Sequence, residues 1–463
     1  MLKFMHGYVA ETWDAQVNSG LVRDCDGVRF CQTTRLGSEK KFNELAAKDS
    51  TLYNIIKERN CPFYVDRLQG GTYISDYRYD QKLIEEYKRM LGDKFWGFQM
   101  HEWLSNYSSD LRKLEDLPEE SWTVEGITAH IKKAFPYPYL FLESMTAEEM
   151  AHYGKPKSFW DYYSFMTDIF KKRQKVGDLI PVDSASLMYA FELEEGCTRI
   201  MPEVGAQTGD ARVQICYARG MTGKEGLHYG VYYEPWGRTP NSIHEKIEGR
   251  PPITACCYQA DGKNEWEIGG SADFPFQTVG HNGGGSRSLQ KRIFLYSYLS
   301  NADFMSEEWG VCNLFFDWKS FELSPYGKVK KDFVDFMEKY PDVGEKLTPI
   351  AAVLPNDLPY IENVFKKPHY KPVFEIDHAD YGKVKEGVIK LFANSAPMAG
   401  TETTTLSNNE IPDALDLLNE GFGDLTKYDY LVDLTFKDTR RPAGRIGAGV
   451  LYLNWLESTN WGL

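Results

Sequence analysis

The sequence predicts an α/β fold, a (β/α)8 TIM barrel followed by a small α/β domain. Eight short apolar runs alternate with helical patterns along the first three-quarters of the 463-residue chain, and most of these runs end in a carboxylate or an aromatic residue. Regular alternation of strand and helix is typical of a parallel sheet covered by helices. An open doubly wound sheet is the alternative. Polar residues recur at many strand ends rather than at one switch point, which favours the closed barrel.

The expected barrel strands are the eight apolar runs Lys3–Val9, Val28–Thr33, Pro62–Arg67, Phe95–Trp103, Leu179–Asp183, Thr198–Val204, Leu227–Trp236 and Ala302–Gly310. Apolar residues at helical spacing predict the helices between them. These are Lys41–Arg59, Gln81–Leu91, Ser158–Gln174, Ser184–Glu195, Asp210–Arg219, Ser288–Ser300 and Ser324–Tyr340. Ser184 is the expected N-cap of its helix, and Gly196 is its expected stop.

The barrel is expected to span residues 1–345, with two long loops at 104–157 and 237–287. Connections of this length are usually functional. The pattern restarts at residue 346 with a buried-type strand at Pro349–Leu354, a helix at Tyr381–Ala393 and a strand at Tyr428–Leu434. This predicts a small α/β domain over 346–440. Residues 441–463 are Arg-rich, then Gly-rich, and contain Trp. This composition is compatible with a short final strand and with a tail outside the domain, and the sequence does not distinguish them.

Composition excludes several classes of function. The chain has 53 basic and 67 acidic residues, a net charge of −14, and no cluster of Lys and Arg, so we expect no nucleic-acid partner. No apolar run approaches the roughly 20 residues that span a bilayer, and no signal peptide is evident. The eight cysteines are scattered without CxxC pairs, which predicts reduced thiols and a cytoplasmic location. No cofactor is expected, and no glycine-rich phosphate loop opens a helix in the predicted domain after residue 346.

Two glutamates at predicted strand ends indicate the chemistry. Glu102 ends the fourth run and Glu234 ends the seventh. Barrel enzymes build their active sites at C-terminal strand ends, and strands four and seven face each other across the barrel. Retaining glycoside hydrolysis needs two carboxyl groups about 5–5.5 Å apart. The pattern therefore predicts Glu102 and Glu234 as the two catalytic carboxyl groups. Most glutamates are simply exposed, and the position after an apolar strand beside Trp favours function here.

Other residues near strand ends and in loops are candidate ligands for sugar hydroxyls or stacking platforms: His6, Asp66, Arg67, His101, Trp103, Glu203, Tyr233, Trp236, His281, Glu308 and Trp309. The structural alternative for each is a satisfied polar group or a packed ring. Hydrogen bonds from Tyr232, Tyr233 or Arg67 are expected to keep the nucleophile ionised. Glu203 and Glu308 are reserve carboxylates. Glu308 becomes the nucleophile if the strand count is shifted by one, because Val28–Thr33 is the weakest strand pattern.

Other catalytic motifs are absent from the sequence. His101-Glu102 does not open an HExxH motif, since Ser105 and Asn106 stand where its second His would be sought. No GxSxG nucleophile elbow is present. A metal bound by Asp66, His101 and Glu203 is conceivable, but no spacing defines such a site, so no metal is expected.

Four stretches resemble one group of barrel enzymes: GFQMHEW at Gly97–Trp103, YYEPWG at Tyr232–Gly237, SEEWG at Ser306–Gly310 and LSPYGKVKKDFVDFMEKYP at Leu323–Pro341. They are similar to retaining β-glycosidases of clan A, particularly β-galactosidases of glycoside hydrolase family 42 and relatives such as family 165. The resemblance implies an acid/base on strand four and a nucleophile on strand seven, which are Glu102 and Glu234 here. The clan usually has Asn directly before the acid/base. This chain has His101, so either His101 takes over the contact with the sugar 2-hydroxyl or the assignment of Glu102 weakens.

The resemblance also implies that the domain after the barrel is flavodoxin-like or amidotransferase-like and serves assembly into a homo-trimer. The expected function is an exo-acting β-galactosidase that hydrolyses an oligosaccharide or glycoside substrate. A barrel glycosidase or lyase for uronic acids is a second reading, which Arg or Lys gathered around the pocket would favour. A non-catalytic carbohydrate-binding barrel is the third, and it predicts strand-end carboxylates too far apart for chemistry.

Overall fold

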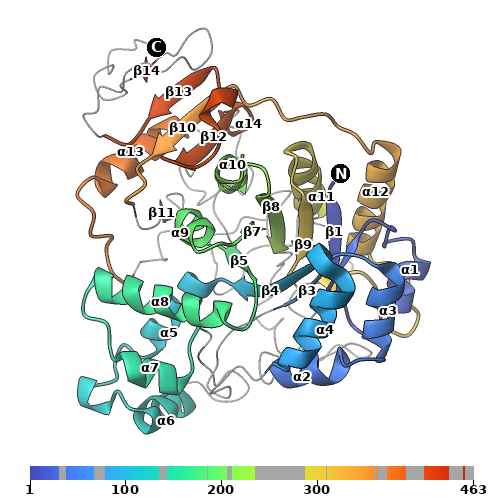
Figure 1. Cartoon of the computed structure of the whole chain (residues 1–463), viewed down its shortest axis with the longest axis horizontal. Helices are drawn as coiled ribbons and strands as arrows, with labels where there is room; N and C mark the ends of the chain where they lie inside the picture. The colour runs from blue at the N-terminus through green and yellow to red at the C-terminus, as the bar shows by residue number, and fades with distance from the viewer. Residues whose placement is uncertain are drawn as a thin grey trace.

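The chain folds around a closed barrel of eight parallel strands (Figure 1), as the sequence predicts. The computed structural model describes residues 1–30, 38–66, 79–134, 142, 144–184, 186–205, 211–234, 287–308, 310–316, 318–358, 361–362, 373–392, 411–436 and 452–453. Each barrel strand pairs with the next, and the last pairs with the first. The strands are β1 (Lys3–Tyr8), β2 (Gly27–Phe30), β3 (Phe63–Val65), β4 (Phe95–His101), β5 (Leu179–Asp183), β7 (Arg199–Gly205), β8 (His228–Glu234) and β9 (Phe304–Glu307).

Large side chains fill the barrel interior. They come from alternate positions of the strands, because successive strand residues point to opposite faces. Two glycines make room for them. A Cβ on Gly27 would lie 2.4 Å from the sulfur of Met5, and one on Gly230 would lie 2.3 Å from the ring of Phe304. The barrel is therefore a packed core rather than a pore. Its interior cluster is Met5, Tyr64, Trp96, Ile180, Val182, Met201, Tyr232 and Phe304.

Helices surround the barrel: α1 (Trp13–Asn18), α2 (Ser38–Leu45), α3 (Thr51–Arg59), α4 (Gln81–Leu91), α8 (Phe159–Gln174), α9 (Tyr189–Glu194), α10 (Ala211–Met221), α11 (Arg287–Leu299) and α12 (Pro325–Lys339). The single helix predicted at Lys41–Arg59 is wrong. Ser50 accepts a hydrogen bond from the amide of Tyr53 and starts a second helix there. The predicted helix Ser184–Glu195 is also too long. Its first residues form a short strand, β6 (Ser186–Leu187), and Met188 occupies the N-cap.

The connection at 104–157 is a helical insertion rather than the predicted loop. It contains α5 (Trp103–Lys113), α6 (Val124–Ala134) and α7 (Ala147–Tyr153). Thr146 and Glu149 form a reciprocal capping box at the start of α7. Glu149 also accepts from both terminal nitrogens of Arg173 on α8 at 2.8 Å. This buried pair anchors the insertion to the barrel helices. Most of the second predicted loop, 237–287, lies outside the described residues.

The C-terminal part forms a second sheet with strand order β12-β10-β13-β14. Its strands are β10 (Ile350–Leu354), β12 (Leu415–Asn419), β13 (Tyr430–Asp433) and β14 (Tyr452–Leu453), all parallel, with helices α13 (Tyr381–Leu391) and α14 (Ile411–Ala414). A short strand, β11 (Ile361–Glu362), pairs with β6 of the barrel connection. Two residues of the predicted tail thus extend the sheet as β14, and the rest of 441–463 lies outside the described residues.

Helix α10 joins the two parts of the molecule. Every one of its residues is buried, which is the pattern of a helix enclosed on all sides. One face packs on β7 of the barrel, and the other packs on β12 of the second sheet (Figure 1). A single apolar cluster consequently runs from barrel residues such as Phe4 and Ile200 to sheet residues such as Ala352 and Leu417.

Among the helices that the structure describes, none has the length and apolar character needed to cross a lipid bilayer. Among the cysteines with described side chains, Cys25, Cys61 and Cys197 are free thiols.

Candidate active site

Polar side chains converge at the C-terminal ends of the barrel strands. His101 ends β4, Glu203 lies near the end of β7, and Glu308 directly follows β9. Glu102 follows His101 as the residue before α5. All parallel strands of a barrel finish at the same rim, so these four residues meet although they are far apart in sequence.

A bulge at Gly97 turns His101 into the barrel. Phe63 pairs with Phe95 and Val65 with Phe98, so β4 has one more residue than β3 between these two points. Trp96 faces the interior before the bulge, whereas Phe98 and Met100 pack outward after it. Without the extra residue, strict alternation would point His101 outward. Gly97 adopts a φ of +88°, and a Cβ there would lie 2.1 Å from the carbonyl oxygen of Asp178, so the site requires glycine.

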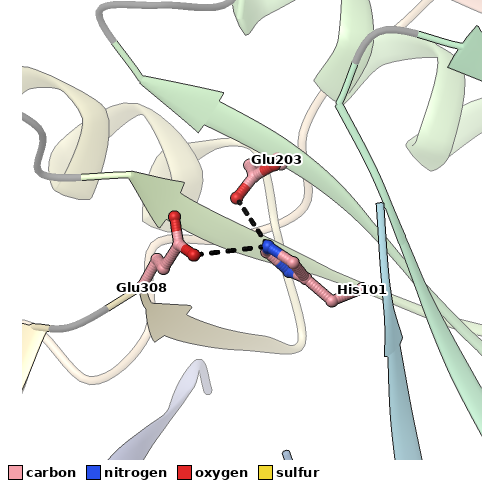
Figure 2. A group of neighbouring side chains, drawn as sticks. All are labelled: His101, Glu203 and Glu308. Atoms are coloured by element: carbon pink, nitrogen blue, oxygen red, sulfur yellow. Dashed lines mark ion pairs between the residues drawn. The ribbon is translucent and has the colours of Figure 1, made fainter. Parts of the chain in front are cut away.

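The imidazole of His101 is the centre of the cluster. Its Nε2 lies 3.3 Å from Glu308 Oε1, 3.4 Å from Glu102 Oε2 and 3.7 Å from Glu203 Oε1. Figure 2 shows the carboxylates of Glu203 and Glu308 approaching this nitrogen from two sides. The side chains of His101, Glu203 and Glu308 are at most 5% exposed, while that of Glu102 is 27% exposed. Glu102 therefore lies on the solvent side of the cluster.

Glu102 is held in an unusual backbone conformation. Its φ and ψ are 45° and 39°, in the left-handed region that residues other than glycine rarely adopt. The amide of Glu102 donates to the carbonyl of Val182 at 2.7 Å, and Asn106 on α5 donates to the carbonyl of His101 at 3.0 Å. Backbone strain of this kind persists where surrounding structure enforces it, often at functional sites.

The pKa of Glu102 is lowered to about 2. Burial among the neighbouring groups raises it, but the hydrogen bond and charge of His101 outweigh burial. The negative charge of Glu308 acts in the raising direction and Glu203 in the lowering direction. Glu102 is thus ionised at neutral pH in this arrangement.

A second polar group lies inside the same rim. Arg29 on β2 donates to Tyr232 at 2.7 Å, to Asp66 at 3.2 Å and to the carbonyl of Glu307 at 2.6 Å. The ring of Tyr232 also meets that of His101 edge to face at 5.2 Å. Arg29, Asp66 and Tyr232 are all buried. This network ties strands β2, β3, β8 and β9 together beneath the cluster.

Several predicted site residues lie outside what the structure describes: Arg67, Trp236, His281 and Trp309. The backbone of Glu234 is described. It ends β8, and its partner across the strand pair is Gly205 of β7. The strand count is as predicted, since β8 is the seventh barrel strand and β9 is the eighth. The side chain of Glu234 is outside the described part of the structure, and its distance to the carboxyl group of Glu102 is therefore outside it too.

Three predicted site residues face away from the barrel mouth, so their assignment to substrate binding is corrected. His6 points outward from β1, where it bonds Asp26 at 3.0 Å and stacks on Phe4. Tyr233 packs outward against Phe294 of α11. Each has an inward neighbour on its strand, Met5 for His6 and Tyr232 for Tyr233. Strand alternation is the physical reason.

Trp103 also turns away, because the chain enters α5 at this residue. Its indole packs between Phe170 and Phe191 and donates to Glu192 at 2.8 Å. It is part of the core behind the rim rather than a stacking platform.

Two functional-site residues were not predicted. Arg29 is a cation inside an apolar strand run, which is a signal the sequence does offer. Gln99 places its amide nitrogen 3.3 Å from His101 Nδ1. No sequence signal distinguishes Gln99, because its inward direction depends on the Gly97 bulge.

Comparisons with known proteins assign no family. No family model matches the chain, and no curated protein matches it. Three solved structures are similar to the chain at low identity. A β-galactosidase from the Antarctic haloarchaeon Halorubrum lacusprofundi is 10% identical with a TM-score of 0.40, over 93% of this chain and 68% of that one. An α-L-fucosidase isoenzyme 2 from Paenibacillus thiaminolyticus is 10% identical with a TM-score of 0.37, over 93% and 59%.

A GH5_18 protein from Bifidobacterium longum subsp. infantis is 12% identical with a TM-score of 0.38, over 91% of this chain and 97% of that one. By these names the structural neighbours are glycoside hydrolases. Similarity at this level assigns no activity to the chain, so the function has to be argued from the site.

Proposed function

We propose that this barrel hydrolyses a glycosidic bond by a two-step retaining mechanism, with Glu234 as nucleophile and Glu102 as acid/base. The observation that supports the proposal is the convergence of Glu102, Glu203 and Glu308 on one histidine at the C-terminal rim of a closed barrel. The oxygens of Glu102 and Glu308 lie within 3.4 Å of the same nitrogen. Carboxyl groups gathered around a rim are what acid/base and nucleophilic attack on an anomeric carbon need.

In the proposed first step, a carboxylate oxygen of Glu234 bonds to the anomeric carbon while the bond to the leaving oxygen breaks. Glu102 gives its proton to that oxygen. In the second step, Glu102 takes a proton from water as the water oxygen attacks, and the glycosyl–Glu234 bond breaks. A terminal β-galactoside is the first substrate to test, because it follows from the resemblance of the four sequence stretches.

The network beneath the cluster supports an ionised nucleophile. Tyr232 precedes Glu234 by two residues on β8 and faces the barrel interior. Arg29 donates to the phenol oxygen of Tyr232 at 2.7 Å. A phenol that accepts from a guanidinium is a better donor through its own O–H, and a donor of this kind stabilises a carboxylate.

Glu102 sets a condition on the mechanism. A general acid must be protonated before it acts, yet His101 lowers the pKa of Glu102 in the free site. The proposal therefore requires the bound sugar to separate Glu102 from His101. Glu102 is the most exposed member of the cluster, which makes this displacement sterically accessible.

The test is a screen with chromogenic β-galactoside, β-glucoside and β-glucuronide, followed by proton NMR of the anomer released first. Glu234→Gln should lose nearly all turnover on every substrate that the wild type cleaves, because an amide cannot form the glycosyl–enzyme bond. Glu102→Gln should lose about 10²–10⁴-fold in kcat on glycosides with poor leaving groups, and much less on dinitrophenyl glycosides, which leave without a proton. Glu58→Gln is the matched control, because Glu58 is an exposed carboxylate at the end of α3, where the chain leads into the start of β3 rather than away from its rim end.

Full activity of Glu234→Gln would overturn the nucleophile assignment. Release of the inverted anomer would overturn retention. Turnover of the glucuronide alone would favour the uronic-acid reading. Sugar binding with no turnover of any glycoside would favour the non-catalytic reading.

We also infer that the sheet built from β10, β12, β13 and β14 is the amidotransferase-like domain of the resembling family and that the chain assembles as a trimer. Light scattering coupled to size-exclusion chromatography tests the oligomer, and a monomer would contradict it.

A further inference from the structure

We propose that His101, Glu203 and Glu308 bind one divalent transition-metal ion such as Zn²⁺. The three side chains come from the ends of three separate barrel strands, and each contributes one nitrogen or oxygen. The three ligand atoms all lie within 4.8 Å of one another, and all three residues are buried. This goes beyond the proposed hydrolysis and does not depend on it.

The separations match ligand atoms around a common ion. The Nε2 atom of His101 lies 3.3 Å from an oxygen of Glu308 and 3.7 Å from an oxygen of Glu203. A charge-assisted N–H···O bond is shorter, about 2.7–2.9 Å. Two ligands with bonds of about 2.0–2.2 Å to one tetrahedral ion are about 3.3–3.6 Å apart. Small side-chain rotations would therefore bring these atoms into coordination (Figure 2).

The donor set selects the class of ion. One imidazole nitrogen with two carboxylate oxygens suits Zn²⁺ and other first-row ions better than Mg²⁺ or Ca²⁺, which prefer oxygen alone. Catalytic zinc sites have three protein ligands of this kind and an open fourth position. Glu102 lies 3.4 Å from the same nitrogen on the exposed side. The open position would therefore face Glu102 and the barrel mouth, where an oxygen of a ligand enters.

The surroundings of His101 fit a ligand histidine. Its Nδ1 contacts the Gln99 side-chain amide at 3.3 Å. Metal-bound histidines usually hold their second nitrogen in a hydrogen bond of this kind, which fixes the ring orientation. An amide can turn either its oxygen or its nitrogen toward the ring, so Nδ1–H can donate to Gln99 while Nε2 faces the ion. A bound dication would also offset the charge of two buried carboxylates, which is expensive to bury otherwise.

The test is metal binding by the full chain without any sugar. The protein is stripped with chelator and titrated with Co²⁺, which reports its coordination through visible ligand-field absorption, and Zn²⁺ is then added in competition. We expect one Co²⁺ per chain, displaced by one Zn²⁺. Glu308→Gln keeps the side-chain shape and should weaken Co²⁺ binding at least about 10-fold, and His101→Ala should weaken it at least about 100-fold.

His228→Ala and Glu58→Gln are the matched controls. They remove a partly exposed histidine at the start of β8 and an exposed carboxylate at the end of α3, where the chain leads into the start of β3. Circular dichroism shows whether each variant is folded, and Glu308→Gln keeps the test decisive if His101→Ala is not. Absence of ligand-field absorption in the folded wild type would overturn the proposal, as would equal Co²⁺ affinity of Glu308→Gln and Glu58→Gln. The readout is binding alone, so glycosidase activity without metal would leave it unaffected.

Discussion

His101 and Glu102 are adjacent in sequence but occupy different environments. His101 completes strand β4 with its side chain fully buried, whereas Glu102 turns into a left-handed conformation and reaches the solvent side of the cluster. A left-handed residue other than glycine costs on the order of 1–2 kcal/mol. The hydrogen bonds of the Glu102 amide to Val182 and of Asn106 to His101 hold this turn in place. The rim thus stores strain where the proposed chemistry occurs.

Behind the rim, Asp183 and Glu192 form a buried pair of carboxyl groups. Burial raises the pKa of Asp183 to about 7, against the lowering effects of its bonds to Met188, Glu192 and Trp103. Burial and the charge of Asp183 raise the pKa of Glu192 well above its ordinary value. The pair therefore holds at least one proton at neutral pH. It also holds Trp103 through the 2.8 Å bond to Glu192, one residue after Glu102.

Asp183→Asn should flatten the pH dependence of stability. The folded pKa of Asp183 lies above its unfolded value, so the folded state binds more protons and the free energy of unfolding falls as pH rises from about 4 to about 7. Asparagine does not titrate, so the variant lacks this fall in the free energy of unfolding. The difference in free energy of unfolding between variant and wild type should shift by on the order of 2 kcal/mol in favour of the variant from pH 5 to pH 8, as measured by urea unfolding. Asp178→Asn, an exposed neighbour, is the control. An equal effect of Asp183→Asn at both pH values would contradict the prediction.

At the scale of single elements, strand β4 decides which residues enter the site. The bulge at Gly97 allows Trp96 to fill the barrel and His101 to face the same interior five residues later. An unbroken alternation would send one of them outward. At the end of strand β9, two adjacent glutamates likewise point to opposite faces. Glu307 turns outward to pair with buried Lys330 of α12 at 2.5 Å, and Glu308 turns inward to His101.

Gly97→Ala should disrupt β4 and the cluster that it positions. The new Cβ would meet the carbonyl oxygen of Asp178 at 2.1 Å, in a backbone conformation with φ of +88°. We expect a loss of about 2–4 kcal/mol in the free energy of unfolding, because clash and backbone strain add. Thermal unfolding measures it. Gly154→Ala also has positive φ but open space around its Cβ, so it reports the strain alone. A Gly97→Ala protein no less stable than Gly154→Ala would refute the role of the bulge.

At the scale of the whole molecule, the C-terminal sheet shares its core with the barrel. Arg219 on α10 contacts Asp416 on β12 at 2.5 Å and donates to the carbonyl of Leu415 at 2.9 Å. Asp416 also accepts from Tyr428 at 2.8 Å and from Thr348 at 3.0 Å. This buried network lies in the interface between the barrel and the second sheet. We therefore expect barrel and sheet to unfold together.

Arg219→Met should destabilise the chain by about 3 kcal/mol, because it leaves Asp416 buried without its cation. The double variant Arg219→Met with Asp416→Leu should be less destabilised than the single one, since no charge is then left buried. Denaturant unfolding followed by circular dichroism measures both. Lys331→Met removes one member of the exposed pair with Asp335 and should change stability by less than about 1 kcal/mol. Two separate unfolding transitions would contradict a shared core.

Sequence alone determined the order and number of the barrel strands. Each strand and helix buries one side or all of its length, and the spacing of its apolar residues along the sequence reflects that burial directly. The same signal placed Glu102, Glu203, Glu234 and Glu308 at or near strand ends, and it predicted the restart of a second sheet after residue 346. Helix boundaries followed capping residues where these were unambiguous, as at Ser158, and failed where an internal Ser50 starts a new helix.

Only the tertiary structure decided which of these side chains meet. The face to which a strand side chain points depends on the register of the strand. The bulge at Gly97 reverses that face for His101, and residue propensities do not predict a bulge. His6, Trp103 and Tyr233 were assigned to the site because they lie on predicted strands. Adjacent strand residues point to opposite faces, however, and a helix start turns Trp103 away. The convergence of His101, Glu203 and Glu308 requires three strands to close into one rim, and closure is a property of the whole barrel rather than of any segment.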